Sequence, residues 1–371
     1  MFDLFLCGDV MLGRGVDQLL PHPSKRQLHE EFVDSATVYV HLAETLNGPM
    51  PHRVSPAYVW GDALPLLAAA RPAARIINLE TAITTVETYW PKGINYRMHP
   101  DNVTCLLAAQ IDCCVLANNH VLDWGQLGLA DTLATLHRAG IATAGAGREA
   151  TEAAAPATLP LADGTRVLVF SFATPSSGVP PEWAAREAVP GVNYLPDLTP
   201  GTASRAIESA LPYWQLGNFR IASIHWGANW GYHIFAEERA FAHALIDAGF
   251  DLVHGHSSHH AKGIELYRQK LILYGCGDFI NDYEGISGYD SYRADLVLMY
   301  LPRIEKTTGR LLSMKMWPFQ LRRFQLKQAS TQDAGWLHQT LARQSAKLGT
   351  TIDMYADGSF VIGSEGTLQC A

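Results

Sequence analysis

Three consecutive segments decide the fold class of this chain: RIASIH at residues 220–225, FAEERAFAHALIDA at residues 235–248 and DLVHGHSSHH at residues 251–260. The first segment and the start of the third are short apolar runs that predict buried strands. In the second segment, Phe241, Leu245 and Ile246 recur at the spacing of a helix. A strand, a helix and another strand in this order predict an α/β fold with much parallel or mixed sheet.

The same alternation continues on both sides of this unit. We predict one further helix at Leu127–Ala139. Further strands are predicted at Met1–Asp9, Arg75–Glu80, Asp112–Ala117, Arg166–Phe172 and Lys270–Tyr274. Two segments rich in proline and polar residues, Pro21–Pro65 and Thr174–Pro200, interrupt the pattern. We expect both to be long loops that cover a site, because loops of this length usually carry function.

The last part of the chain has a different character. Asp295–Ile304 and Leu311–Leu326 predict a long antiparallel hairpin around a turn that contains Gly309. Ser330 is placed to cap a helix that runs to about Leu348, and a final strand is predicted at Ser359–Ile362. We therefore predict one domain, with a core over residues 1–300 and a hairpin, helix and strand over residues 301–371 packed on it.

Composition excludes several classes of partner. The chain has 371 residues, with 28 Lys and Arg against 36 Asp and Glu, a net charge of −8. This acidic balance, without a run of basic residues, argues against nucleic acid or an anionic membrane as the main partner. No apolar run is long enough for a transmembrane helix, and the N-terminus lacks the basic region of a secretory signal. The six cysteines form no C-x-x-C pair, so we expect reduced thiols in a cytoplasmic protein.

Polar residues gather where the predicted strands end. These residues are Asp9, Asn78, Glu80, Asn118, Asn119, His120, His225, His254, His256, His259 and His260. The carboxyl ends of strands in an α/β sheet form its ligand crevice. Carboxylates, an amide oxygen and imidazoles suit a transition metal with mixed oxygen and nitrogen ligands. Each residue alone has a structural alternative, such as a turn, an Asx cap or a buried hydrogen-bonded histidine, but together they predict a metal site.

Short motifs that follow one another along the chain extend this prediction. They are GDVMLGR (8–14), NLE (78–80), NNHVLDWG (118–125), HWG (225–227), GHSSH (255–259) and LYGCGDF (273–279). In this order the motifs resemble those of the CapA/PgsA capsule-synthesis family, a branch of the calcineurin-like metallophosphoesterases. The last is similar to a Tyr-Ser-Leu-Gly-Asn-Phe segment of that family. The resemblance implies a metallophosphoesterase-like sandwich of two mixed sheets flanked by helices, with the site at the strand ends.

The resemblance also implies roles for individual residues. Glu80 takes the place of a bridging carboxylate, Asn119, His225 and His256 would hold one ion, and Asp9 and His259 would hold another. His120 corresponds to a catalytic proton-transfer group that Asp123 orients. Arg14 is the candidate for a catalytic anion-binding residue, and Arg97 and Asn78 are the candidates for substrate binding. Both arginines have a structural salt bridge as the alternative.

The chain departs from the metallophosphoesterase pattern at Met11, where that pattern has a histidine. A thioether does not replace imidazole for a hard or borderline ion, so the site of Asp9 and His259 loses a ligand. Glu80 stands where the pattern has an aspartate. We therefore predict a divalent ion, Mn or Zn, in one tight site, with a second ion held more weakly.

Three functions remain open at this point. The first is a metal-dependent hydrolase that attacks a phosphoester or an amide, with His120 as general acid/base. The second is a metal-dependent peptide epimerase, because relatives of this family include one that acts in lasso-peptide biosynthesis. The third is a non-catalytic binding protein for anionic polymer in capsule or poly-γ-glutamate synthesis. The complete set of histidines and carboxylates favours an enzyme with a small-molecule or peptide substrate. The sequence predicts no oligomeric state.

Overall fold

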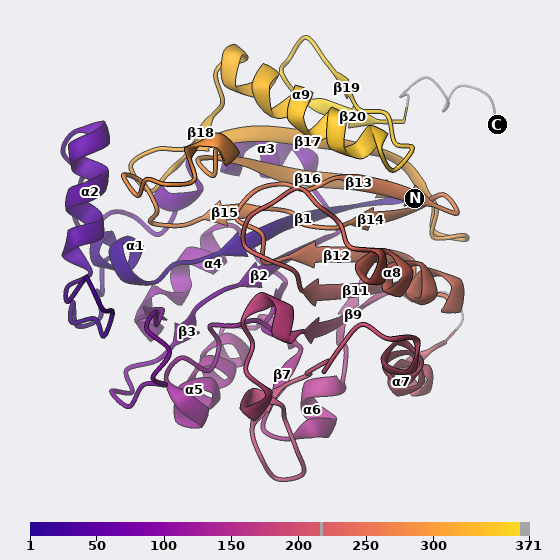
Figure 1. The fold of residues 1–371 in the computed structure, drawn as a ribbon, viewed down its shortest axis with the longest axis horizontal. Coiled ribbons are helices and arrows are strands. Elements are labelled where there is room, and N and C mark those ends of the chain that lie inside the picture. The colour runs from indigo at the N-terminus through magenta and orange to yellow at the C-terminus, as the bar shows by residue number, and fades with distance from the viewer. Residues whose placement is uncertain (216–217, 364–371) are drawn as a thin grey trace.

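The computed structural model describes residues 1–215 and 218–363, and two large mixed sheets form its centre (Figure 1). The first sheet has ten strands in the order β19-β20-β17-β16-β1-β2-β5-β6, with β15 beside β1 and β18 beside β17. Their bounds are β1 Phe2–Val10, β2 Ala74–Leu79, β5 Cys113–Val115, β6 Ala142–Ala144, β15 Asp278–Ile280, β16 Leu296–Ile304, β17 Leu311–Leu321, β18 Leu326–Gln328, β19 Asp353–Met354 and β20 Phe360–Ile362. In this sheet β1, β2, β5 and β6 run parallel to one another.

The second sheet has six strands in the order β13-β14-β12-β11-β9-β8. Their bounds are β8 Ala157–Pro160, β9 Arg166–Ala173, β11 Asn218–His225, β12 Leu252–His256, β13 Ile264–Tyr267 and β14 Lys270–Leu273. The four central strands are parallel. Two small sheets pair β3 (Ala82–Ile83) with β4 (Arg97–Met98), and β7 (Ala146–Gly147) with β10 (Gly191–Val192).

The two large sheets pack face to face and helices cover their outer faces, so the α/β sandwich implied by the resemblance is confirmed. Leu4 and Leu6 of β1 share one core with Ile221 of β11 between the sheets. Apolar residues of α1, α3, α4 and α5 pack on the outside of the first sheet, and those of α7 and α8 on the outside of the second. The helices are α1 Arg14–Leu19, α2 Thr37–Asn47, α3 Ala63–Ala70, α4 Thr104–Ala108, α5 Gly125–Arg138, α6 Ala150–Ala154, α7 Pro200–Ala210, α8 Ala236–Ala248 and α9 Thr331–Ala346.

The C-terminal hairpin is part of the first sheet. Strand β16 pairs antiparallel with β1 from Phe2 to Leu6, and β17 continues the sheet beyond it. The helix predicted after Ser330 is confirmed as α9, and the Ser330 hydroxyl accepts the N–H of Asp333 as its cap. Leu337 and Leu341 of α9 belong to the core between the sheets, so this helix closes one edge of the sandwich (Figure 1).

The two segments predicted as long loops contain regular structure. Pro21–Pro65 includes α2 and the start of α3, and α2 buries Tyr39, Val40 and Ala43. Thr174–Pro200 includes two single-turn 3₁₀ helices and β10. The sequence analysis predicted loops here and did not predict these short elements, because tertiary packing stabilises them in polar, proline-rich sequence.

The cysteine and membrane predictions can be checked in the described part of the chain. Five cysteines are buried and free, whereas Cys370 lies outside the described residues. Within residues 1–215 and 218–363, no helix has both the length and the apolar character needed to cross a bilayer.

Candidate metal centre

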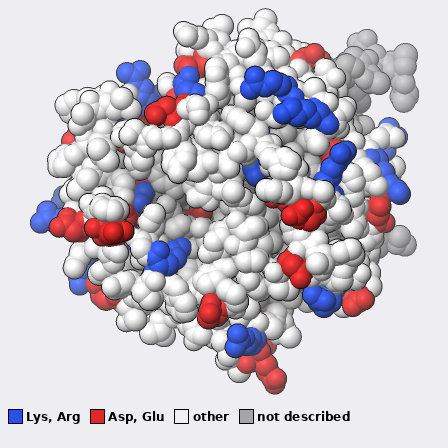
Figure 2. Space-filling view, in the orientation of Figure 1, with Lys and Arg blue, Asp and Glu red and all other residues white. Residues whose placement is uncertain are grey.

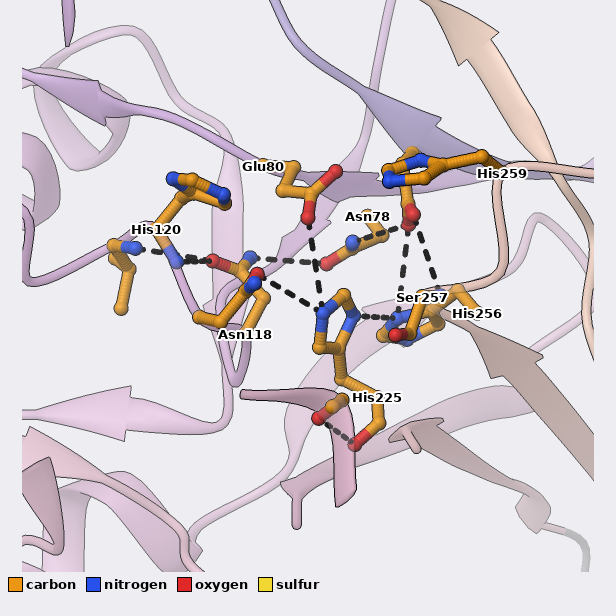
Figure 3. Close-up of polar contacts among 12 residues, drawn as sticks. Asn78, Glu80, Asn118, His120, His225, His256, Ser257 and His259 are labelled. Carbon is orange, nitrogen blue, oxygen red and sulfur yellow. Dashed lines mark hydrogen bonds and ion pairs between the residues drawn. The ribbon is translucent and has the colours of Figure 1, made fainter. Parts of the chain in front are cut away.

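Polar side chains of both sheets meet at the carboxyl ends of the parallel strands (Figure 3). In the first sheet, Asp9 of β1 lies in register with Asn78 of β2 on one side and with Asp278 of β15 on the other. In the second sheet, His225 of β11 lies in register with His256 of β12. In-register neighbours share one face of a sheet, so each sheet presents a row of polar groups. The two rows face each other, with His256 Nδ1 3.9 Å from Asp9 Oδ1.

His225 lies at the centre of an imidazole-rich group. Its Nε2 atom is 3.1 Å from Asn119 Oδ1 and 3.7 Å from Glu80 Oε1. Its Nδ1 atom is 2.8 Å from His256 Nδ1. The structure thus brings together the four residues that were predicted around one ion.

A series of buried hydrogen bonds through Ser223 and His254 determines which nitrogen of His256 carries its proton. His254 Nε2 is 2.8 Å from the carbonyl oxygen of Cys7, and because a carbonyl can only accept, this nitrogen carries a proton. Burial lowers the pKa of His254 to about 4, so its Nδ1 is unprotonated at neutral pH. The Ser223 hydroxyl therefore donates to His254 Nδ1, at 3.0 Å, and accepts from His256 Nε2, at 2.9 Å. His256 Nδ1 is left as a lone pair directed at His225.

This donor set fits a divalent cation. Because His256 Nδ1 is a lone pair, the proton between the two rings belongs to His225 Nδ1. The Nε2 atom of neutral His225 is then a lone pair too, and it faces the oxygens of Asn119 and Glu80. Converging acceptors repel one another unless a cation lies between them, and imidazole with amide and carboxylate oxygen suits Mn²⁺ or Zn²⁺.

A second group lies on the other side of Asp9. The ligand atoms of Asp9, His259 and Asp278 all lie within 4.8 Å of one another, and so do those of Asp9, His225 and His256. Asp9 is therefore the carboxylate that both groups share, whereas the resemblance implied Glu80 as the bridge. The N–H of Ser257 donates to Asp9 Oδ2 at 3.3 Å, from a residue whose φ of 103° lies in the region that favours glycine.

Burial favours the neutral forms of these groups. It raises the pKa of Asp9 to about 7, with a further rise from Asp278 and an opposing effect of the hydrogen bond from Asn78. Burial, reinforced by the Asp9 carboxylate, raises the pKa of Glu80 well above its usual range. Burial also lowers the pKa of His225 well below its usual range. Neutral imidazole is the form that binds metals, and a bound cation would favour ionised carboxylates.

His120 lies at the edge of this centre and is paired with Asp123. The distance from His120 Nδ1 to Asp123 Oδ2 is 2.7 Å, so the predicted contact between these residues is confirmed. The ring stacks on Tyr96 with centroids 3.8 Å apart. Burial and the charge of Lys92 lower the pKa of His120 well below its usual range. Its Nε2 makes no hydrogen bond to the described residues and is the atom available for proton transfer.

Three of the predicted site residues are engaged elsewhere. Asn78 is fully buried, donates to Asp9 Oδ1 at 2.7 Å and accepts from Asn118, so it orients Asp9 and does not face a substrate. The Arg14 guanidinium donates to both oxygens of Asp282 and to Glu30. Arg97 donates to the carbonyl oxygen of Val86 and stacks on Trp124. For Arg14 the geometry supports the structural alternative, because each of its three guanidinium nitrogens bonds a carboxylate. Arg97 is held through its Nη1 atom and through the face of its guanidinium.

Sequence reasoning missed two charged residues at the centre. Lys92 Nζ lies 2.8 Å from Asp123 Oδ1 and bonds the carbonyl oxygen of Asn119, and nothing in its surrounding sequence indicated this position. Asp278 had a usable signal, because Gly277-Asp278 repeats the Gly8-Asp9 pair of the first strand.

Comparisons with known proteins support the family suggested by the motifs. The family model described as bacterial capsule synthesis protein PGA_cap matches residues 3–283. A probable polyglutamine synthesis accessory protein of Mycobacterium tuberculosis is 46% identical over 355 residues, which are 94% of this chain and 92% of that protein. The PGA biosynthesis protein CapA of Bacillus subtilis is 27% identical over 55% of this chain and 52% of that protein. A 5′-nucleotidase precursor from Thermus thermophilus aligns in structure with a TM-score of 0.45 and 13% identity, over 94% of this chain and 59% of its own.

The family match covers well over half of the chain, and the mycobacterial relative aligns over almost all of it. The matched residues include every strand end that contributes to the centre, from Asp9 on β1 to Asp278 on β15. The prediction from the motifs is thereby confirmed, and the chain belongs to the PGA_cap family of bacterial capsule synthesis proteins.

Proposed function

We propose that this chain is a metal-dependent hydrolase that cleaves an amide bond in a glutamate- or glutamine-containing peptide. The observation that supports catalysis is the His120–Asp123 pair beside the imidazole-rich group, with His120 Nε2 available. The substrate class follows the names of the relatives, which concern polyglutamine synthesis and PGA biosynthesis. An amide is favoured over a phosphoester because all three guanidinium nitrogens of Arg14, the residue predicted to bind an anion, already bond carboxylates.

The residues of the centre have separate tasks in this proposal. A divalent ion held by the imidazole-rich group and Asp9 would act as a Lewis acid toward the scissile carbonyl and would lower the pKa of a water molecule. Asp123 accepts the Nδ1 proton of His120, so His120 Nε2 is the atom that first takes up a proton and then returns it to the leaving nitrogen. Lys92 pairs with the other oxygen of Asp123 and favours the ionised carboxylate that this role needs.

The function as a non-catalytic binding protein for an anionic polymer has less support than the hydrolase. In the view of Figure 2, acidic and basic side chains are scattered among uncharged ones, and no broad basic surface gathers among the described residues on that face. A protein that only binds a polyanion is expected to present such a surface. Cytoplasmic location and a peptide partner stay predictions from the sequence.

One experiment in heavy water separates the three functions. The Mn²⁺-loaded protein is incubated with short γ- and α-linked glutamate peptides, with glutamine peptides and with p-nitrophenyl phosphate, and the products are analysed by mass spectrometry. A hydrolase gives shorter peptides, which His120→Asn should abolish. Deuterium at an α-carbon without cleavage indicates the epimerase instead. Binding without either change indicates a polymer-binding protein, and fast turnover of the phosphate ester alone contradicts the amide substrate.

A further inference from the structure

The pairing of β15 with β1 places an aspartate of each strand next to the other. The N–H of Asp9 donates to the carbonyl oxygen of Gly277 at 3.1 Å, and Asp9 is in register with Asp278. A Cβ atom on Gly8 would lie 1.7 Å from the oxygen of Gly277. Glycine at position 8 is therefore what lets β15 approach β1 closely enough to bring Asp278 beside Asp9.

The Asp278 carboxylate is held in one orientation. Asn281 Nδ2 donates to Asp278 Oδ2 at 2.7 Å, which leaves Oδ1 3.0 Å from His259 Nδ1. Asp278 is 2% exposed, so its carboxyl group is buried beside that of Asp9. His259 is held in turn through its N–H, which donates to the carbonyl oxygen of Asn229 at 2.9 Å. Two carboxylates and an imidazole thus converge from three separate segments.

The side chain of Met11 makes a local hydrogen bond. Its sulfur accepts the N–H of Gly13 at 3.1 Å, and the side chain is 1% exposed. The position where the motif pattern has an imidazole therefore supplies no ligand, and a carboxylate on the neighbouring strand lies beside the same aspartate.

We propose that Asp9, His259 and Asp278 form a second metal site, in which the Asp278 carboxylate replaces the imidazole that Met11 cannot supply. This inference rests on the metal centre of the proposed function. Two carboxylates and one imidazole favour Mn²⁺, whereas the imidazole-rich group around His225 also suits Zn²⁺. The second ion is then held tightly, contrary to the weak second site that we expected from Met11 alone.

Titration of the metal-free full-length protein with MnCl₂ tests this site. Stoichiometry and affinity are measured by calorimetry and by elemental analysis after dialysis, without any substrate. We expect two Mn²⁺ per chain in the wild type. Asp278→Asn keeps the shape of the side chain but removes its charge, so it should retain one ion and weaken the other at least about tenfold. His259→Asn should affect the same ion.

Asp17→Asn is the matched control. Asp17 is also a fully buried aspartate, but it bonds Asn102 and the N–H of His99, away from the centre. It should bind two ions with wild-type affinity, and circular dichroism establishes that each variant is folded. If Asp278→Asn does not fold, His259→Asn decides the question by the same loss of one ion.

The outcomes separate this site from the proposed function. A folded Asp278→Asn variant that binds two ions as tightly as the wild type overturns the second site, and so does a wild type that binds one Mn²⁺. If the wild type binds two ions and cleaves no peptide, the second site stands and the proposed function fails. If it cleaves peptides with one ion bound, the function stands and the second site fails.

Discussion

Ser223→Ala should weaken both metal binding and folding, although Ser223 is not expected to touch a metal. Its hydroxyl is fully buried and links His254 Nδ1, at 3.0 Å, to His256 Nε2, at 2.9 Å. Without it, His254 Nδ1 has no donor, and His254 cannot move its proton because Nε2 bonds the carbonyl oxygen of Cys7. His256 can then carry its proton on Nδ1 and donate it to His225 Nδ1, which moves the proton of His225 to Nε2, the atom that faces Asn119 and Glu80. In these tautomers neither of the two nitrogens offers a lone pair to an ion.

The magnitude follows from the number of buried atoms that lose a partner. Each unpaired buried polar group costs about 1–3 kcal/mol. His256 recovers part of this cost by moving its proton, so we expect the free energy of unfolding of the metal-free protein to fall by about 2–4 kcal/mol. The loss of a residue that orients a ligand lowers metal affinity by about 10–100-fold.

Urea unfolding of the chelator-treated protein and competition with a metal indicator measure these two effects. Ser171→Ala is the control, because Ser171 is the in-register neighbour of Ser223 on β9 and is equally buried. Its hydroxyl has no hydrogen-bond partner among the described residues. The control should leave metal affinity unchanged and cost little stability. Equal effects of the two substitutions on metal affinity would refute the proton arrangement inferred for His256.

Three further predictions concern the same centre. Glu80→Ala and His256→Ala should each lower the metal content of the purified protein, measured by elemental analysis, and unchanged content in both would contradict the ligand assignment. His120→Asn should keep the fold and the metal but lower kcat at least about 100-fold, and a loss of metal as large as in His256→Ala would contradict its role in proton transfer. Burial lowers the pKa of His254 and His260 to about 4 from an ordinary value of 6.5, whereas it raises the pKa of Asp9 to about 7. Between pH 4 and 6.5 the two histidines bind more protons in the unfolded chain and Asp9 binds more in the folded chain, so their effects on the free energy of unfolding oppose each other. His260→Asn removes one of the destabilising histidines, so relative to the wild type its metal-free form should become more stable as pH falls from 6.5 to 4, and urea midpoints with the same pH dependence in both proteins would contradict this.

Most of the fold was predictable because its elements have strong local periodicity. The helix predicted at Phe235–Ala248 is α8 at Ala236–Ala248, and the predicted strands around it are present. The helix α2 at Thr37–Asn47 was missed, since it depends on packing against α1 more than on its own sequence. The place of the C-terminal hairpin beside β1 was missed as well, because alternation along a chain does not specify which strands become neighbours.

The site was predictable to the extent that its residues follow strands. Asp9, His225 and His256 come at the carboxyl ends of their strands, and the structure brings them together. The same rule did not identify Asp278, because this residue begins β15 instead of ending a strand. Lys92 comes from a segment between β3 and β4 that has no periodic pattern, so only the folded arrangement places it beside Asp123.

The pair Met11 and Asp278 shows why a missing motif residue does not by itself imply a missing ligand. Two residues along a strand cover about 6.6 Å, whereas neighbouring strands lie about 4.8 Å apart, so a position beside Asp9 can be filled from another strand at least as easily as from its own. The end of β1 has such a neighbour because β15 lies against it at Gly8, in the register that pairs Asp9 with Asp278. A metal ion selects for donor atoms at given positions in space and not for their order in the chain. The carboxylate of Asp278 is also a different kind of ligand from the imidazole of a histidine, because it makes this half of the centre richer in oxygen. We therefore expect the two halves to differ in metal preference, with His225 and His256 on the nitrogen-rich side and the two aspartates on the other.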